Sequence, residues 1–344
     1  MIGHGKEGFL LREHLLFCVL LLAVLLTCAA VGSVSLPLDE AARSIWRAAA
    51  GRPQEEGSLA ASILLPVRLP RVLCAGLVGA ALSLCGGAMQ GLLKNPLADG
   101  STLGVSSGAS LGAVIAIAFG ISIPGLPFTG TMVLAILFAF LSLLLILALA
   151  YRLDASLSTN TIILIGVIFS MFASSFSSLI ITFAVEKVKT ITFWTMGSLQ
   201  GGGYRNAAIL AGALLLFGGA ILLHCRELNA FAVGEDNART IGVDVRRVKL
   251  RVLICVSVLI GVSVSVSGTI GFVGLVTPHI MRLVFGPNHR RLLPATIYGG
   301  AIFLMLSDLA ARTILSPREL PIGVVTSLIG SVVFIYIFFS ARRG

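Results

Sequence analysis

Long apolar runs separated by short polar connections are the main pattern of this chain. A helix that crosses the hydrocarbon core of a bilayer needs about 20 predominantly apolar residues. Ten runs meet or approach that length, and they cover residues 15–36, 72–93, 104–123, 129–150, 161–184, 207–223, 252–267, 271–283, 292–311 and 322–339. The pattern predicts an all-α polytopic membrane protein with about ten transmembrane helices, forming a single domain over residues 1–344. The first run is longer than the apolar core of a typical signal peptide, so we expect a retained membrane helix.

Prolines and glycines divide the longer uncharged stretches. No charge occurs between Asp99 and Arg152, which is too far for one helix, and the prolines of segment 124–127 separate two runs within it. Arg71 opens a long run that is followed by a short, glycine-interrupted one, and Arg251 opens a second pair of the same kind. Since the two pairs start from opposite sides of the membrane, they indicate an inverted repeat, a common device of transporters.

The composition favours a membrane protein over a large soluble helical domain. Hydrophobic residues make up 57% of the 344 residues and charged residues 12%, whereas soluble domains carry about 25% charged residues. The net charge of +10 comes from basic residues between the runs, as in the cytoplasmic loops of membrane proteins. No stripe of arginine and aromatic residues indicates nucleic-acid binding. The distribution predicts a multi-pass protein of the bacterial cytoplasmic (inner) membrane, with both termini in the cytoplasm.

Catalytic and metal-binding patterns are missing from the sequence. Its six cysteines form no CxxC pair, five of them lie inside apolar runs, and the five histidines form no HExxH. We therefore expect no catalytic residue and no metal site. The P-loop pattern GxxxxGK(S/T) is also absent, so the chain does not bind ATP by that route.

A polar segment over residues 226–245 follows the sixth run and is the main candidate for a functional element. Gly234 and Gly242 predict two short helices, 227–233 and 235–241, because glycine commonly terminates helices. Helices this short are marginal alone in water and need a partner surface. We interpret them as docking helices on the cytoplasmic face, and a solvated connecting loop is the alternative. Their candidate apolar contacts are the side chains of Leu228, Phe231, Val233 and Ile241.

An ordered series of longer motifs extends from Arg68 almost to the C-terminus. The strings are RLPR from Arg68, GAMQGLLKNPLADGSTLGVSSGAS from Gly87, WTMGSL from Trp194, GEDNARTIGVD from Gly234, GTIGFVGLVTPHIMR from Gly268, GPNHRRLLP from Gly286 and ELPIGVVTSLIG from Glu319. With these motifs the chain resembles the FecCD-type permeases of binding-protein-dependent ABC importers, which carry iron-siderophores, haem or cobalamin.

The resemblance implies a type II ABC importer permease with no cofactor of its own. It would pair with a second permease subunit, either an identical copy or a close paralogue, within membrane lipid. Two separate ATPase subunits, which bind ATP and magnesium, and an extracytoplasmic substrate-binding protein would complete the transporter. Residues 226–245 would then be coupling helices, with ATPase-coupling residues Leu228, Phe231, Gly234, Glu235, Asp236, Arg239 and Gly242.

Two further groups of residues resemble functional positions of the family. In the family, outward-facing arginines accept acidic residues of the substrate-binding protein. The residues of this chain that resemble them are Arg68, Arg71 and Arg312. Arginines that snorkel to the membrane interface are the alternative. The family also has two cytoplasmic gate segments. The residues that resemble them are Asn95, Pro96 and Leu97 for the first segment and Ser158, Thr159 and Asn160 for the second. Ordinary helix-ending loops are the alternative. We expect a pair between Asp308, the only charge of its run, and Arg312 one helical turn later.

One departure from the family lies in the last run. Members usually carry a proline shortly after the glycine that matches Gly330, but this chain has Ser331 and Val332 there. Without the proline we expect the tenth helix to continue straighter.

The expected function is ATP-driven import of a metal chelate into the cytoplasm, with an iron-siderophore favoured over haem and cobalamin. The alternative is a secondary transporter driven by an ion gradient. Such a transporter is expected to carry a carboxylate or ion site near the membrane midplane, and the only carboxylate that the runs offer is Asp308, near one end. An intramembrane enzyme would need a catalytic cluster at membrane depth, and none is present.

Overall fold

The computed structural model describes residues 8–32, 37–53, 60–100, 103–122, 129–155 and 157–341, and these contain helices and no strand. The predicted all-α fold is therefore confirmed over this part of the chain. In chain order the α-helices are α1 Leu11–Ala30, α2 Leu38–Ala49, α3 Leu69–Leu92, α4 Val105–Ala118, α5 Thr129–Leu153, α6 Thr159–Phe183, α7 Val188–Thr195, α8 Tyr204–Ala213, α9 Gly219–Leu223, α10 Cys225–Val233, α11 Glu235–Thr240, α12 Val245–Ser267, α13 Val273–Phe285, α14 His289–Thr313 and α15 Ile322–Ala341.

The predicted membrane runs all coincide with apolar helices. In the described part of the chain, seven helices are long and apolar enough to cross a membrane, and three shorter apolar helices lie at 105–118, 273–285 and 322–336. The seven candidate spans and the three shorter apolar helices agree with the predicted number of about ten. The second begins earlier than predicted, because a π-helical turn over Ala60–Arg68 leads into α3. The sixth joins α8 to α9 through a π-helical turn over Leu214–Gly218.

Two helices were not expected. The polar stretch after α1 contains α2, which is amphipathic: it buries Ala41 and exposes Trp46. The loop after α6 contains α7. Helix α1 ends at Ala30, before the predicted end of the first run, and residues 33–36 of that run lie outside the described residues. At the other terminus α15 runs without a break past Val332, as expected for a chain without the family proline.

Helix α3 is the centre of the bundle and is largely buried. It packs against α14, α13, α12, α8 and α10. Glycines allow the closest approaches: a Cβ atom at Gly79 would lie 2.2 Å from the carbonyl oxygen of Gly300, and one at Gly86 would lie 1.8 Å from that of Gly274. Small residues that bring backbones together in this way are typical of membrane helix packing.

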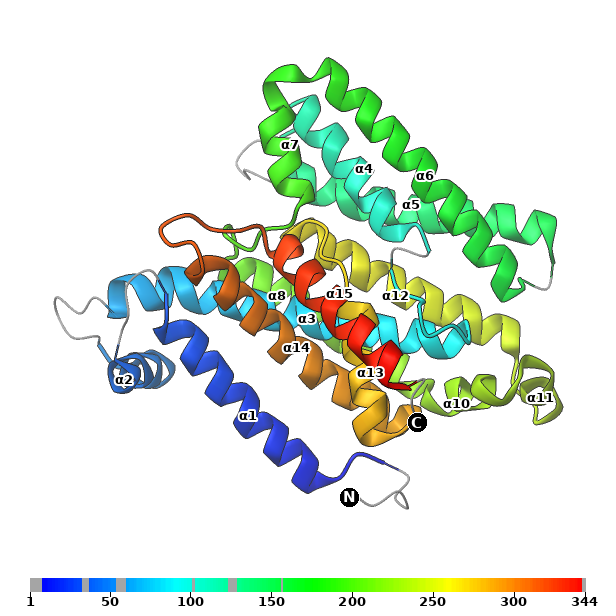
Figure 1. The fold of residues 1–344 in the computed structure, drawn as a ribbon, viewed down its shortest axis with the longest axis horizontal. Coiled ribbons are helices and arrows are strands. Elements are labelled where there is room, and N and C mark those ends of the chain that lie inside the picture. The colour runs from blue at the N-terminus through cyan, green and yellow to red at the C-terminus, as the bar shows by residue number, and fades with distance from the viewer. Residues whose placement is uncertain are drawn as a thin grey trace.

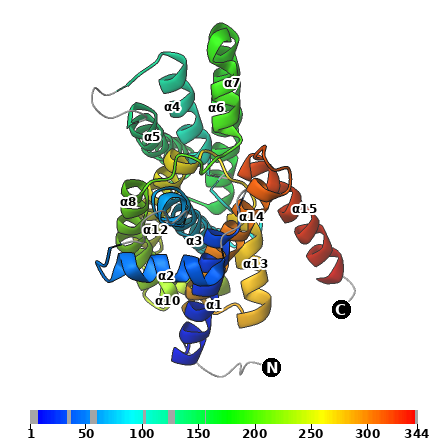
Figure 2. The same cartoon turned by 90° about the vertical axis from the view of Figure 1, so that its left-hand side faces the viewer.

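A second group of helices lies on one side of the bundle (Figure 1). It consists of α4, α5, α6 and α7, and α12 joins it to α3 by packing against both α5 and α3. The long α3 followed by the short α4, and the long α12 followed by the short α13, have the predicted order of the inverted repeat. On another side α15 stands away from the bundle and packs mainly against α14 and α13 (Figure 2).

The contact between α3 and α13 yields a prediction on stability. Changing Gly86 to alanine forces a methyl group onto the backbone of Gly274, which cannot move independently of α13. We expect a loss of about 3 kcal/mol or more of unfolding free energy, at the upper end for an overpacked core. Thermal unfolding of the purified protein in detergent measures the change. Gly219→Ala is the matched control, because no atom lies within 4 Å of a Cβ at that position. Equal melting temperatures for the two variants would contradict the tight contact.

Candidate coupling and gate site

The polar segment after α9 folds as the two predicted short helices. Helix α10 ends at Gly234, whose φ of 153° lies outside the range that other residues readily adopt, and α11 is followed by Gly242 with a φ of 88°. Glycine is favoured at such positions because it has no Cβ. Glu235 and Asp236 occupy the first turn of α11, where negative charge interacts favourably with the helix dipole.

The two helices bury one face and expose the other. Leu228 and Phe231 are fully buried, whereas Val233 and Ile241 are 72% and 71% exposed. The prediction that Leu228 and Phe231 contact a partner is wrong for this structure, because these side chains anchor α10 in the core of the chain itself. The surface left for a partner carries the apolar side chains of Val233 and Ile241.

Helix α10 is fastened to the start of α14 by polar contacts. The side-chain oxygen of Asn229 accepts hydrogen bonds from the backbone nitrogen of His289 at 2.8 Å and from its ring Nδ1 at 2.8 Å. Asn229 Nδ2 donates to Asn288 Oδ1 at 2.9 Å. The ring of His289 lies directly against Gly91, near the end of α3. Burial raises the pKa of the Cys225 thiol to about 11, so this group is a neutral donor to the His289 carbonyl, 3.5 Å away. In this structure His289 links α10 to α14 and packs against α3.

Helix α11 is fastened to a different part of the bundle. Glu235 Oε1 lies 2.7 Å from Lys249 Nζ, on α12. Thr159 Oγ1, in the first turn of α6, donates to the same oxygen at 3.4 Å. Lys249 also donates to the carbonyl oxygen of Leu157 at 3.0 Å and is fully buried. A single ammonium group thus joins α11, α12 and the connection between α5 and α6.

The two predicted gate segments both lie beside this junction. The first, residues 95–97, is a turn after α3 in which Asn95 Oδ1 accepts from the backbone nitrogen of Leu97 at 2.9 Å. The neighbouring Lys94 brings its Nζ to 3.6 Å from the point where a Cβ of Gly234 would lie. The second segment, residues 158–160, begins α6, and its Thr159 contacts Glu235. We call residues 234–235 the coupling turn, because Thr159 of the second segment and Lys94, which directly precedes the first, both lie beside it.

The start of α6 is held by local side-chain contacts. The backbone nitrogen of Ser158 donates to Asp154 Oδ2 at 3.1 Å, and Ser158 Oγ lies 2.9 Å from Thr161 Oγ1. Asn160, like Pro96 and Leu97, is exposed. Polar groups of the non-helical connection before α6 are thus hydrogen-bonded within the protein. Membrane proteins require such internal partners wherever the backbone is not helical.

The start of α3 and the end of α14 lie at the opposite end of the bundle from α10 and α11 (Figure 1). Two of the predicted docking arginines, Arg68 just before α3 and Arg312 near the end of α14, are buried there. Arg68 and Arg312 are each 6% exposed. Arg68 Nη1 donates to the carbonyl oxygens of Ala29 and Ala30 at 3.3 and 2.8 Å. Arg312 donates to those of Cys28 and Val31. The two guanidinium groups thereby satisfy carbonyls at the end of α1, which have no partner within their own helix.

The third predicted docking arginine, Arg71, joins two carboxylates. Its Nε and Nη2 donate to Asp308 at 3.0 and 2.9 Å, and its Nη1 donates to Glu319 at 3.0 Å. The predicted pair of Asp308 with Arg312 is also present, with a distance of 3.4 Å between Arg312 Nε and Asp308 Oδ2. Contact of these arginines with a binding protein would require them to exchange the present partners, and it stays a prediction.

Three of the sequence motifs meet at this same end. The backbone nitrogen of Ser198 donates to Ser267 at 2.8 Å, and that of Gly323 donates to Met196 at 3.1 Å. The junction borders an open groove of about 580 Å³, whose lining includes Met196, Thr269, Phe272, Ser327, Leu328 and Ser331. The groove offers hydroxyl groups and apolar surface, and its lining carries no charge.

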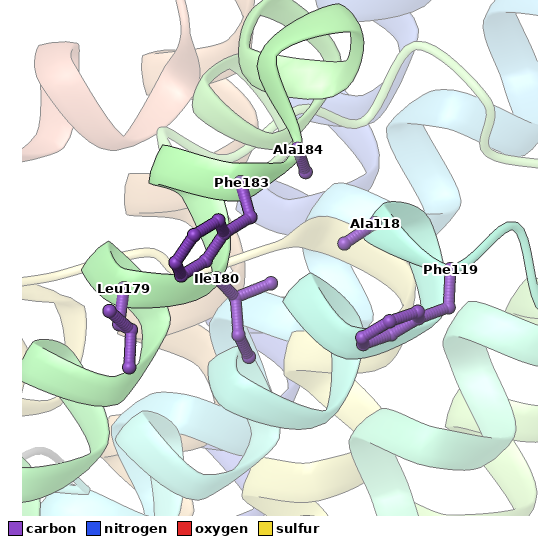
Figure 3. Close-up of a pocket in the computed structure, with 6 residues that line it drawn as sticks. All are labelled: Ala118, Phe119, Leu179, Ile180, Phe183 and Ala184. Atoms are coloured by element: carbon purple, nitrogen blue, oxygen red, sulfur yellow. The ribbon is translucent and has the colours of Figure 1, made fainter.

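A smaller cavity of about 230 Å³ lies between the ends of α4 and α6 (Figure 3). Its six lining residues are apolar: Ala118, Phe119, Leu179, Ile180, Phe183 and Ala184. A hydrated or charged cargo would find no polar contact in this cavity.

Comparisons with known proteins decide the family. The model of the FecCD transport family matches residues 19–340. This chain belongs to the FecCD family. One relative is the uncharacterized ABC transporter permease protein YvrB of Bacillus subtilis, 44% identical over 91% of this chain and 89% of its own. Another is the hemin transport system permease protein HmuU of Yersinia pestis, 36% identical over 94% of this chain and 95% of its own.

A solved structure has the same fold as this FecCD chain. It is described as an inward-facing conformation of a metal-chelate type ABC transporter. The two chains are 31% identical, the match covers 96% of this chain and 99% of the other, and the TM-score is 0.84. The predicted fold class, an ABC importer permease, is confirmed.

Sequence reasoning missed two residues of this FecCD site, Lys249 and Asn229. A signal for Lys249 exists in the sequence. On α12 the buried side chains include Val245, Val248 and Val252, and Lys249 falls on the same face at helical spacing. A cation on an apolar face requires a buried partner, but the identity of that partner is set by contacts distant in sequence.

The arginine cluster of the FecCD chain yields a prediction. Replacing Asp308 with alanine leaves Arg71 and Arg312 buried with one carboxylate fewer. Removing one member of a buried ion pair typically costs about 3–5 kcal/mol of stability, and thermal unfolding in detergent measures it. Asp39→Ala is the matched control, because Asp39 pairs with Arg43 on the surface, where the two side chains are 71% and 65% exposed. Surface pairs contribute roughly 0–1 kcal/mol, so a similar loss in both variants would contradict the buried cluster.

Proposed function

We propose that this chain is the pore-forming permease of an ATP-driven importer for a metal chelate. The observation that carries the proposal is the junction at the coupling turn, where Glu235 contacts Thr159 of the second gate segment and Lys94, which directly precedes the first, lies beside Gly234. A push on α10 and α11 from outside the membrane therefore reaches the helix ends that border the pore. Such small displacements at helix interfaces are a known way to switch a packed membrane bundle between states.

The driving force comes from separate ATPase subunits in this proposal. The sequence has no P-loop of its own. The exposed side chains of Val233 and Ile241, with Asp236 and Arg239 beside them, offer a compact mixed surface for docking. Basic residues near this end, among them Lys94, Arg246 and Arg247, support a cytoplasmic location for it. Both termini are then cytoplasmic as well.

A second permease subunit completes the pore in this proposal. Helices α6 and α15 expose large apolar side chains such as Phe172, Leu328 and Tyr336. Apolar surface of this extent in a membrane protein faces lipid or another subunit. The uncharged groove between Thr195 and Ser331 fits a passage that contacts its cargo only weakly. The partner is an identical copy or a close paralogue.

For the cargo we favour an iron-siderophore, with haem and cobalamin as the other candidates. Relatives of nearly equal identity are named for hemin, cobalamin and molybdate import, so overall similarity does not select one cargo. The groove carries no charged side chain that would select a ligand. Selectivity then resides mainly in the extracytoplasmic substrate-binding protein, which delivers the chelate to the end of the bundle opposite α11.

The docking surface yields a prediction for the purified complex. Changing both Val233 and Ile241 to aspartate places charges in an apolar contact. We expect at least about tenfold weaker binding of the ATPase subunit, which corresponds to 1.4 kcal/mol, while the permease itself stays folded. Affinity purification in detergent and the dissociation constant measure the effect. Trp46→Asp is a control, because Trp46 is 68% exposed on α2, away from α10 and α11 (Figure 1).

Uptake into proteoliposomes tests the function itself. We expect ATP-dependent uptake of an iron-loaded siderophore when the permease, its ATPase and its binding protein are combined, and the same vesicles test haem and cobalamin. Uptake that persists without the ATPase and follows an ion gradient would contradict the proposal and favour the secondary transporter. The secondary transporter would need Asp308 as its ion site. The carboxylate of Asp308 already forms ion pairs with Arg71 and Arg312, which disfavours this alternative.

A further inference from the structure

We propose that Lys249 is the positioning residue that transmits movement of the coupling turn to the second gate segment. The inference rests on the proposed function, since it requires an ATPase that moves α11. It adds the specific connection through which the movement passes.

The geometry around Lys249 Nζ carries the inference. The ammonium lies 2.7 Å from Glu235 Oε1, on α11, and donates to the carbonyl oxygen of Leu157 at 3.0 Å. Its side chain is fully buried, whereas that of Glu235 is 25% exposed. A buried charge is stable only with partners that replace water, so neither contact can lengthen without a cost. Displacing Glu235 therefore pulls Lys249, Leu157 or both.

Leu157 is well placed to pass the movement on to α6. It directly precedes Ser158, the residue at the start of α6. Its backbone has a φ of 53°, a region that residues other than glycine seldom occupy. Its nitrogen donates to the carbonyl of Asp154 at 2.9 Å, and its side chain is buried. The carbonyl that Lys249 holds is thus part of a tightly constrained turn. Two residues after Leu157, Thr159 makes a second contact with the carboxylate of Glu235.

The two halves of the coupling segment have different attachments. Asn229 ties α10 to α14, and the ring of His289 packs against α3, so α10 moves with the centre of the bundle. Helix α11 is tied through Glu235 to α12 and α6 instead. Gly234 separates the halves, and its φ of 153° gives the chain a permissive joint there. Helix α11 also packs against α10, but among the described residues its ion pair with the rest of the bundle is the one to Lys249, so a force on α11 reaches Lys249 directly.

A purely structural role for Lys249 makes a different prediction. If the ammonium only neutralised Glu235, its loss would weaken the whole cytoplasmic end, and ATP hydrolysis and transport would fall together. A transmitting role predicts that the two separate. The test therefore compares movement of α11 with movement of the gate segment in the same molecule.

Spin-label distances in the complete complex provide this comparison. Labels are placed at the exposed Asn237 on α11 and at Asn160 in the gate segment, each paired with a reference label at Leu283 on α13, in a Cys18→Ser background because Cys18 is exposed. In the otherwise unchanged chain we expect ATP to shift both distances. In the Lys249→Met variant we expect the 237–283 distance to shift as before, and the 160–283 distance to stay at its resting value.

Transport measurements accompany the distances. For Lys249→Met we expect ATP hydrolysis within about twofold of the unchanged protein, and siderophore uptake per ATP lower by about tenfold, within the usual range of coupling between sites. Lys249→Arg, which keeps the charge and the donors, restores the gate movement. Arg247→Met is the matched control on the same helix, because Arg247 is 76% exposed and pairs with Asp244 at the surface, and we expect it to change neither measurement.

Three results would overturn the inference. In Lys249→Met the gate distance shifts with ATP as in the unchanged chain, or hydrolysis and uptake fall in parallel, or Lys249→Arg fails to restore the movement. If Lys249→Met does not assemble, Glu235→Gln tests the same link from the other side and should also separate the two distances. Failure of the proposed function is distinguishable, because then the 237–283 distance would not respond to ATP even in the unchanged chain.

Discussion

A buried charge in a membrane protein must find its partner inside the protein, and this constraint organises both ends of the bundle. At one end the guanidinium groups of Arg68 and Arg312 satisfy the last carbonyls of α1, while Arg71 joins Asp308 to Glu319. At the other end Lys249 joins Glu235 to Leu157. Between the two ends the helices pack through glycines and apolar side chains. The bundle is therefore held by non-directional packing in the middle and by specific polar contacts where it meets water.

These two polar ends differ in what they connect. The arginine cluster joins α1, α3, α14 and the loop before α15, and its charged groups are nearly enclosed except for Glu319, which is 35% exposed. The Lys249 junction reaches the surface through Glu235 and the exposed face of α11. In the proposed function the driving force acts on the exposed face of α11, which the Lys249 junction connects to α12 and α6. The docking role of the arginines and the mechanical role of the coupling turn both stay predictions.

Much of the fold could be predicted because the thickness of the membrane sets the length of the apolar helices that cross it. All ten runs became helices, and the glycines at 234 and 242 terminated the short helices as predicted. Helix α2 was missed because it is amphipathic and only 12 residues long. The interpretation of Leu228 and Phe231 as partner contacts was wrong because apolar side chains three residues apart share one helix face, and that face turned inward. The link from Lys249 to Leu157 spans 92 positions, and one sequence contains no signal for such a pairing.

The account depends most directly on α11 facing the cytosol and being held there by the ATPase. A single reporter cysteine at Ile241, in a Cys18→Ser background, measures this with a membrane-impermeant maleimide. The account predicts labelling in inside-out vesicles, no labelling in intact spheroplasts, and strong protection when the ATPase subunit is added. Labelling from the outer side, or full labelling in the presence of a functional ATPase complex, would contradict it.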